Sequence, residues 1–387
     1  MAGNFASLAK KVFIFLNLLA AFVFLIACYG PYLNPQSWWF LLFLGLSFPL
    51  LFLVIIFFIF FWILISPRYI FISIAALLLG WKGVSVFLAV RPIPDFNTEK
   101  PKDVLRVVHW NVARFVEWRR NNNKGSQTRL RMMDLIQRQN ADVLCFSEFY
   151  HSTDSEYYDN LNYVMKDLGY PYFHFSWDDD GGRQWVGQAI FSRYPIIDSG
   201  IVRFPKPGIQ ESLIYADVVF HRDTLRFYTM HLQSVQFKKR DYENIEKIKH
   251  RDDSIFESSR GILSKLKRAT IIRAHQADMV KSALNSSPYP SIVTGDFNDV
   301  PNSYTYYTIS DNLQDAFLKK SFGVGRTFSG ISPTLRIDYI LAAKSLSVLQ
   351  FDRHVRKYSD HYMLVADLKV NPPAPKEKII PAPKKKN

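Results

Sequence analysis

The sequence predicts a layered α/β domain that follows an apolar, helical N-terminal region. Three observations support this prediction. The chain has no Asp, Glu, Lys, Arg or His between Lys11 and Arg68, whereas a soluble domain needs charged residues on its surface. From residue 104 onward, short β-branched runs alternate with longer stretches of helical periodicity. The strands outnumber the helices, and the helices lie between groups of strands, which is typical of α/β and α+β domains.

Residues 1–92 are expected to form a transmembrane region of three helices, at about 12–29, 38–65 and 69–90. A helix of about 20 apolar residues crosses the hydrocarbon core of a bilayer. The second segment begins with Trp38 and Trp39, which suit the membrane interface. The third segment is interrupted by Lys82, so it either spans the membrane or lies on its surface.

The first apolar segment has an alternative interpretation. Lys10 and Lys11 precede an apolar run that ends in Leu25-Ile26-Ala27-Cys28, and this resembles a bacterial lipoprotein signal. A polar linker normally follows such a signal, whereas further apolar segments follow here, so membrane helices are favoured. Cys28 and Cys145 are the only cysteines, and their placement in a span and a strand excludes a disulfide framework.

Basic residues predict the orientation in the membrane. Lys10 and Lys11 precede the first span, Arg68 lies between the second and third, and the first connection is uncharged. Because basic residues remain cytoplasmic, the first connection should lie outside. With three spans, the chain would be a multi-pass protein of the bacterial inner (cell) membrane, with its C-terminal domain on the periplasmic or outer side. With two spans, that domain would stay in the cytoplasm.

The C-terminal domain is expected over residues 103–370, followed by a disordered, Pro- and Lys-rich tail at 371–387. Helical periodicity predicts helices at 128–139 and 258–284. Compact apolar runs predict strands, two of which form a hairpin-like pair. These strands are expected at 104–112, 141–146, 187–192, 212–220, 224–232, 292–296, 336–342 and 361–370.

Polar side chains gather at or near the ends of these strands. Taken singly, each has an ordinary explanation as a turn former, a solvated acid or a structural histidine. Together they indicate a site, because ligands bind outside the carboxyl ends of sheet strands. The set comprises Asn111, Glu148, His231, Asp296, Asn298, Asp338, Asp360 and His361.

The residue types in this set favour one chemistry. Glu148 and Asn111 offer hard oxygen ligands, which suit Mg²⁺ or Mn²⁺. The sequence has no cysteine cluster of the kind that binds zinc. Asp338 could hold one ring nitrogen of His361 and leave the other for proton transfer. A hard cation with an Asp–His pair fits hydrolysis of a phosphate ester by an activated water.

The same set resembles the endonuclease/exonuclease/phosphatase superfamily, which includes deoxyribonuclease I. The resemblance covers about residues 103–370 and follows the order of the superfamily motifs: Asn111, Glu148, His231, GDFN at 295–298, RIDYIL at 336–341 and SDH at 359–361. It implies a four-layered α/β sandwich, in which two packed mixed sheets are flanked by helices. The N-terminal helices lie outside the resemblance.

The resemblance also implies a role for each residue. Glu148 would be the principal metal ligand, with Asn111 beside it and Asp360 completing the shell. Asp296 would orient or deprotonate the attacking water. His231 and Asn298 would contact the phosphate. His361, held by Asp338, would act as general base or as a stabilising cation, and which of Asp296 and His361 takes the proton stays open. Ser147 departs from the superfamily, where glutamine is common before the metal-binding glutamate.

We therefore expect a membrane-anchored, divalent-metal-dependent phosphoesterase. The net charge of +14 is compatible with a polyanionic substrate but does not imply one. Nucleic acid and phospholipid or inositol phosphate remain open as substrates: residues 118–120 and 237–240 combine aromatic and basic side chains, whereas the anchor favours a lipid. The lipid bilayer is an expected partner, and no protein partner is implied. The alternative is a catalytically degenerate binding module with the same fold.

Overall fold

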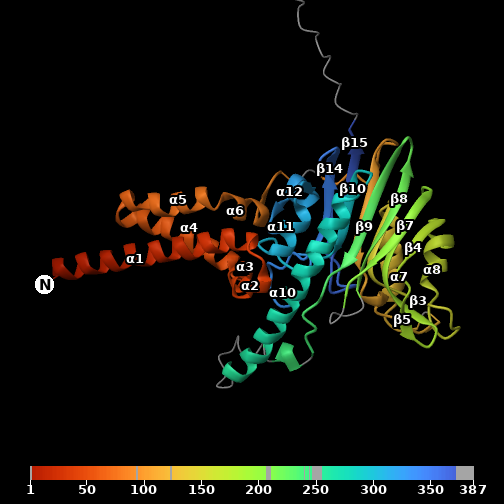
Figure 1. Ribbon diagram of the computed structural model, residues 1–387, viewed down its shortest axis with the longest axis horizontal. Helices are drawn as coiled ribbons and strands as arrows, with labels where there is room; N and C mark the ends of the chain where they lie inside the picture. The colour runs from red at the N-terminus through yellow and green to blue at the C-terminus, as the bar shows by residue number, and fades with distance from the viewer. Residues whose placement is uncertain are drawn as a thin grey trace, which may run out of the picture.

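The computed structural model describes residues 2–92, 95–122, 124–205, 211–238, 240–243, 245 and 255–371. Apart from Asn371, the tail expected to be disordered lies outside these residues. The described chain has an N-terminal bundle of apolar helices attached to a β-rich domain (Figure 1).

The N-terminal bundle packs α1 (Ala2–Tyr29) against α4 (Phe48–Ile65) and α5 (Ile70–Leu79), which α6 (Trp81–Phe87) follows. Within the described residues, two helical segments are long and apolar enough to cross a membrane, Ser7–Tyr32 and Phe48–Ile65. The pair Pro67–Leu79 and Trp81–Phe87 is bent by 67°, and it makes a third candidate if the two helices form one span.

The segment expected as one helix at 38–65 is divided. It contains the end of α2 (Pro35–Trp38), the 3₁₀ turn η2 (Trp39–Leu41), α3 (Leu42–Leu46) and then α4. Proline occupies the first turn of α4, where its missing N–H costs no helical hydrogen bond. Only the 18 residues of α4 form a continuous helix, which is about 27 Å long.

A buried polar contact joins the three long helices of the bundle. The Asn17 side chain donates to Ser73 Oγ and accepts from Trp62 Nε1, both over 2.9 Å. In an apolar environment such a group needs partners, so the triplet specifies how α1, α4 and α5 face one another. At the bend, a Cβ on Gly80 would lie 2.7 Å from Cys28 Sγ, so only glycine lets α5–α6 approach α1 this closely.

The β-rich domain contains two sheets. The first sheet has the order β11-β13-β10-β9-β8-β7, and the second has the order β14-β15-β2-β3-β6-β4, with β5 paired to β6. Within the first sheet β9 and β10 are parallel, and within the second β2 and β3 are parallel, whereas the other pairs are antiparallel. The strands of the first sheet are β7 (Ile196–Arg203), β8 (Ser212–Phe220), β9 (Asp223–His231), β10 (Ser291–Asp296), β11 (Leu313–Asp315) and β13 (Asp338–Ala343). Those of the second are β2 (Leu105–Asn111), β3 (Val143–Ser152), β4 (Tyr172–Phe175), β5 (Asp178–Gly181), β6 (Gln184–Ser192), β14 (Leu346–His354) and β15 (Met363–Val370).

The two sheets pack face to face and helices cover their outer faces (Figure 1). The inner core combines Val107 of the second sheet with Ile214 and Ile292 of the first. The helix α7 (Thr128–Arg138) packs on the outer face of the second sheet. The helices α10 (Ile255–Asn285) and α11 (Tyr304–Ser310) pack on the outer face of the first. The structure thus confirms the predicted four-layered α/β sandwich.

Short elements connect these layers. They are η1 (Gly30–Tyr32), η3 (Pro67–Tyr69), β1 (Ala89–Val90), η4 (Ala113–Phe115), α8 (Asn160–Asn162), the π-helical turn η5 (Tyr163–Asp167), α12 (Ala316–Lys320) and β12 (Phe322–Gly323).

The β-rich domain is attached to the helical bundle at several points. Strand β1, which follows α6, pairs with β12 of the domain. The Asn302 side chain donates to the Gly83 carbonyl over 3.1 Å, and the buried Arg336 guanidinium donates to the Val86 carbonyl. A Cβ on Gly45 of α3 would lie 2.3 Å from the Asn302 carbonyl oxygen, so the backbones approach too closely for any other residue. These contacts set the position of the domain relative to the bundle.

Candidate active site

The pairing of three strands brings the polar strand ends together. Parallel β9 and β10 end at the same level, so His231 lies beside Asp296. Antiparallel β13 begins there, which places its first residue, Asp338, across from Asp296 on the other side. Asp296 and Asp338 are buried, and His231 is half-buried. The sheet register therefore accounts for three of the predicted site residues.

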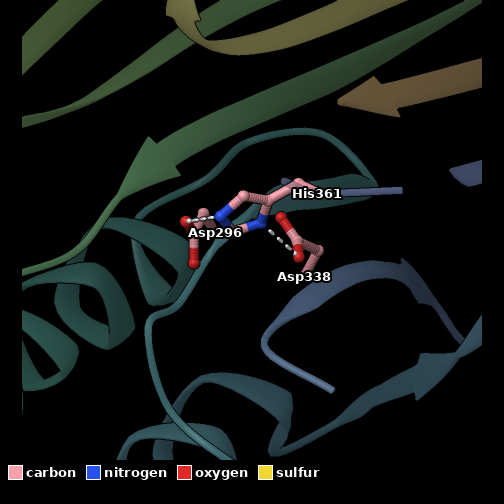
Figure 2. A group of neighbouring side chains, drawn as sticks. All are labelled: Asp296, Asp338 and His361. Atoms are coloured by element: carbon pink, nitrogen blue, oxygen red, sulfur yellow. Dashed lines mark hydrogen bonds and ion pairs between the residues drawn. The ribbon is translucent and has the colours of Figure 1, made fainter. Parts of the chain in front are cut away.

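His361 lies between the carboxylates of Asp338 and Asp296 (Figure 2). Its Nδ1 atom is 2.8 Å from Asp338 Oδ2, and its Nε2 atom is 3.6 Å from Asp296 Oδ2. Burial alone would lower the pKa of His361, but the two carboxylates raise it to about 10. The imidazole ring is therefore held as a cation between two acids.

The two acids respond differently to this arrangement. Burial raises the pKa of Asp338, but the charge and hydrogen bond of His361 and the nearby His109 outweigh it, so the pKa is lowered overall. For Asp296, burial and the nearby charge of Asp338 outweigh the histidines, and its pKa is raised. Asp338 thus remains ionised, whereas Asp296 is the better proton acceptor of the pair.

Asn111 and Glu148 lie beside Asp296. The Asn111 Nδ2 atom donates to Asp296 Oδ2 over 3.1 Å and to Glu148 Oε1 over 3.3 Å. Glu148 has φ of +51°, and the pairing of β3 with β6 shifts register between Phe146 and Phe149. This bulge turns the carboxylate of Glu148 out of the strand and toward the cavity that it lines, leaving it one-third exposed at 34%.

His231 connects this group to an acid that the sequence analysis missed. Its Nε2 atom lies 3.5 Å from Asp296 Oδ2 and 3.8 Å from Glu148 Oε1, and its Nδ1 atom lies 3.6 Å from Glu211 Oε1. Burial lowers the pKa of His231, but the charges of Glu211, Asp296 and Glu148 raise it overall. Burial raises the pKa of Glu211 to about 7, against the opposing charge of His231.

His109 also lies beside the site, although it was not among the residues predicted from the sequence. This fully buried residue places Nε2 3.5 Å from Asp338 Oδ1, on the side of Asp338 opposite to its bond with His361. His109 lies two positions before Asn111 in β2, so period-2 alternation puts both side chains on the same face of the strand. That alternation is the sequence signal that could have identified it.

The last two predicted residues lie at the cavity surface. Asn298 donates from its backbone to Asp296 Oδ1 over 2.8 Å and from its side chain to the Leu232 carbonyl over 3.0 Å. Asp360 is exposed and accepts from Ser359 Oγ over 3.2 Å. Both line the same cavity of about 450 Å³ as Glu148 and His361. Six of the eight predicted residues therefore line this cavity, and Asn111 and Asp338 contact the lining residues Asp296 and His361.

The chemistry of these side chains fits a hard divalent cation. Ligand atoms of Asp296, Asp338 and His361 lie within 4.8 Å of one another, but these groups already pair with one another: His361 is hydrogen-bonded to Asp338 and forms an ion pair with Asp296. The carboxylate of Glu148 faces the cavity instead, beside the Asn111 side chain. The Asn111 nitrogen faces Glu148 and its Oδ1 accepts from the Ala113 backbone N–H over 3.1 Å, so the amide would turn over to offer its oxygen to a cation. Carboxylate and amide oxygens are the ligands that Mg²⁺ and Mn²⁺ prefer.

Comparison with known proteins identifies the domain. A family profile described as the endonuclease/exonuclease/phosphatase family matches residues 108–361, about two thirds of the chain, and a second profile, a domain of unknown function, matches residues 10–87. No curated protein matches the chain.

Several solved structures are similar to part of the chain. An endonuclease/exonuclease/phosphatase from Beutenbergia cavernae DSM 12333 is 20% identical, with coverage of 70% of this chain and 72% of that chain and a TM-score of 0.49. The human Nocturnin catalytic domain with bound sulfate is 18% identical, with coverage of 73% and 98% and a TM-score of 0.48. D. rerio TDP2 complexed with a single-strand DNA product is 16% identical, with coverage of 69% and 99% and a TM-score of 0.44. From the profile match over residues 108–361, the chain belongs to the endonuclease/exonuclease/phosphatase family, whose members are typically hydrolases of phosphoester bonds.

Proposed function

We propose that the protein is a membrane-anchored, divalent-metal-dependent phosphoesterase. The observation that carries this proposal is the convergence of Glu148, Asp296 and the Asp338–His361 pair at one end of a cavity of about 450 Å³. Hydrolytic sites usually contain acids and bases with shifted pKa values that face a cavity beside a group of oxygen ligands.

Mg²⁺ or Mn²⁺ would be held by Glu148 and Asn111, with Asp360 as a further carboxylate at the cavity surface. When bound, the cation would neutralise the nonbridging oxygens of the phosphate ester.

Asp296 would orient the attacking water and accept its proton. Its pKa is raised, and its carboxylate is positioned by Asn111 on one side and His361 on the other. His361, with a pKa of about 10, would remain a cation and stabilise negative charge on the phosphorus-bound oxygens. His231 and Asn298, which line the same cavity, would contact the remaining phosphate oxygens.

The helical bundle would anchor the enzyme as a multi-pass protein of the inner (cell) membrane, with the catalytic domain on the outer side. The N-terminus of α1 lies at the end of the bundle far from the domain, whereas α6 ends beside it (Figure 1). Lys10, Lys11 and Arg68 lie toward that far end, so the positive-inside rule favours a cytoplasmic N-terminus.

A reporter cysteine tests this orientation. Glu99→Cys places a thiol at an exposed position just before the catalytic domain, and both native cysteines are buried. Labelling of intact cells by an impermeant thiol reagent is expected. Protection in intact cells with labelling after lysis would instead put the domain in the cytoplasm.

The activity is tested on a small, soluble diester, bis(p-nitrophenyl) phosphate. The full-length protein in detergent is expected to hydrolyse it with Mg²⁺ or Mn²⁺ and to lose this activity in chelator. Glu148→Gln should reduce turnover while leaving the thermal unfolding temperature near that of wild type. Equal activity with and without chelator would contradict the proposal, as would a binding-only protein that hydrolyses no phosphate ester.

A further inference from the structure

The cavity that holds the candidate catalytic residues continues along an apolar wall. We define this wall by Leu42 and Leu46 of α3 and by Ile262 and Leu266 of α10, all of which line the cavity together with Glu148, Asp296 and His361. The cavity lining therefore combines acids and histidines with aliphatic side chains. This combination matches a ligand that has a charged group and a hydrocarbon chain.

The apolar wall begins at the membrane-facing part of the molecule. Leu46 lies two residues before Phe48, where the candidate span Phe48–Ile65 begins. Trp38 and Phe40, just before α3, are each 47% exposed, as is typical of aromatic residues at a membrane interface. The Lys267 Nζ atom of α10 lies 4.3 Å from the centroid of the Trp39 ring, and this contact joins α10 to the segment. The wall is thus continuous with the surface on which the bilayer would rest.

The described residues that line the cavity offer few cations to a polyanion. Among the described residues that line it, Arg273 is the only arginine or lysine, and it is buried. Its Nε atom pairs with Asp299 over 3.2 Å, and its Nη1 atom donates to the Gln233 carbonyl. Nucleic acids bind through cations that neutralise successive phosphates. The cavity offers no such series along the apolar wall.

We propose that the substrate is a phosphate ester with a hydrocarbon chain, drawn from the bilayer, whose chain lies along Leu42, Leu46, Ile262 and Leu266 while its phosphate meets His231, Asp296 and His361. This inference rests on the proposed phosphoesterase function and specifies its substrate class. Each methylene that leaves water for an apolar wall contributes roughly fourfold to binding of the reacting complex. Activity should therefore rise with chain length when the head of the substrate stays the same.

The first experiment uses wild-type protein and alkyl p-nitrophenyl phosphates, which share one leaving group and differ only in the alkyl chain. Ethyl, butyl and octyl esters are compared as dissolved monomers in a constant amount of detergent. The octyl ester has six more methylenes than the ethyl ester, so kcat/KM should rise by up to about 10³-fold, and by at least about tenfold if only two of them contact the wall. The same values for all three esters, or faster hydrolysis of single-stranded DNA than of the octyl ester, would overturn the inference.

Variants then assign the chain-length dependence to the apolar wall. Leu266→Asp and Leu46→Asp should each reduce the octyl-to-ethyl ratio of kcat/KM by about tenfold, because a carboxylate opposes the hydrocarbon. The matched control is Leu263→Asp, on the same helix but 43% exposed and outside the cavity lining, which should keep the wild-type ratio. Leu46 is itself 37% exposed, so its variant should fold even if the Leu266 variant does not. A wild-type ratio in the folded Leu46 variant would contradict the assignment.

The outcomes separate this inference from the function on which it rests. If bis(p-nitrophenyl) phosphate is hydrolysed but the ester series is flat, the phosphoesterase function stands and the hydrocarbon site is wrong. If no ester, including the small diester, is hydrolysed with Mg²⁺ or Mn²⁺, the phosphoesterase function itself is wrong and the substrate class fails with it.

Discussion

The Nδ1 atom of His361 lies 2.8 Å from Oδ2 of Asp338, although the two residues are 23 positions apart and belong to different sheets. Asp338 begins β13 of the first sheet, and His361 lies just before β15 of the second. The hydrogen bond therefore depends on how the sheets pack, and the candidate site exists only in the assembled sandwich.

If the pair acts as a unit, its two members should not contribute independently. His361→Ala is expected to reduce kcat/KM by about 10²–10⁴-fold, which is the usual contribution of a positioned acid–base group. Asp338→Asn should reduce it comparably, because the imidazole loses its partner. The double variant should be no worse than the poorer single variant. Losses that multiply would show that the residues act separately.

The same pair predicts how stability depends on pH. The folded-state pKa of His361 is about 10, above the ordinary value of 6.5. A raised histidine pKa stabilises the folded state fully below about pH 6.5, and this contribution is lost as the pH rises toward about 10. The unfolding temperature of wild type should therefore fall more steeply over this window than that of His361→Gln. Parallel curves for the two proteins would contradict the raised pKa.

Glu211 should control the protonation of His231. Among the charges that raise the pKa of His231, that of Glu211 has the largest effect. Glu211→Gln removes this charge, so the pKa of His231 should fall. The alkaline limb of the kcat/KM profile is expected to shift to lower pH, and histidine NMR titration provides a direct measurement. Glu156→Gln, at an exposed position away from the cavity lining, is the control. Unchanged profiles in both variants would leave Glu211 a structural residue.

Metal binding can be measured apart from catalysis. Glu148→Gln should raise the Kd for Mn²⁺ by about tenfold or more, as loss of a ligating group or its support typically does. Isothermal titration calorimetry or Mn²⁺ paramagnetic resonance measures this without substrate. The Glu156→Gln protein should bind Mn²⁺ like wild type. A Kd that is unchanged in Glu148→Gln would exclude Glu148 as a principal ligand.

The contact between the bundle and the domain can be tested at Gly45. Gly45→Ala would place a Cβ 2.3 Å from the Asn302 carbonyl oxygen, so the backbones must move apart. We expect a lower unfolding temperature and faster proteolysis between the two parts. Gly261→Ala on α10 is the matched control, because its Cβ would meet nothing within 4 Å. Equal effects of the two substitutions would mean that this close approach is unimportant.

Much of the fold could be predicted because local patterns specify it. The compact apolar run at residues 212–220 predicts β8 with its observed bounds, and the helical periodicity near residue 130 predicts α7 within one residue at its end. The bend at Gly80 could not be predicted, since it depends on close packing against Cys28 of another helix. Strand β14 was missed because exposed and buried residues are mixed along it.

The site shows the same distinction. Asp296 and Asn298 could be chosen from the sequence because a strand, a glycine and two polar residues follow one another there. Glu211 could not be chosen, because it lies just before β8 and reaches His231 only through the pairing of β8 with β9. Sequence patterns thus identify residues at strand ends, whereas residues that support them from a neighbouring strand require the register.

The attachment of the domain to the bundle through β1–β12 and Asn302–Gly83 has a kinetic consequence. If, as proposed, the bundle lies in a bilayer and the substrate is a lipid, a cavity held at one height and tilt would encounter that substrate by lateral diffusion within a single leaflet. The rate would then follow the mole fraction of substrate in that leaflet, and inert lipid added at constant bulk substrate concentration would slow the reaction by surface dilution.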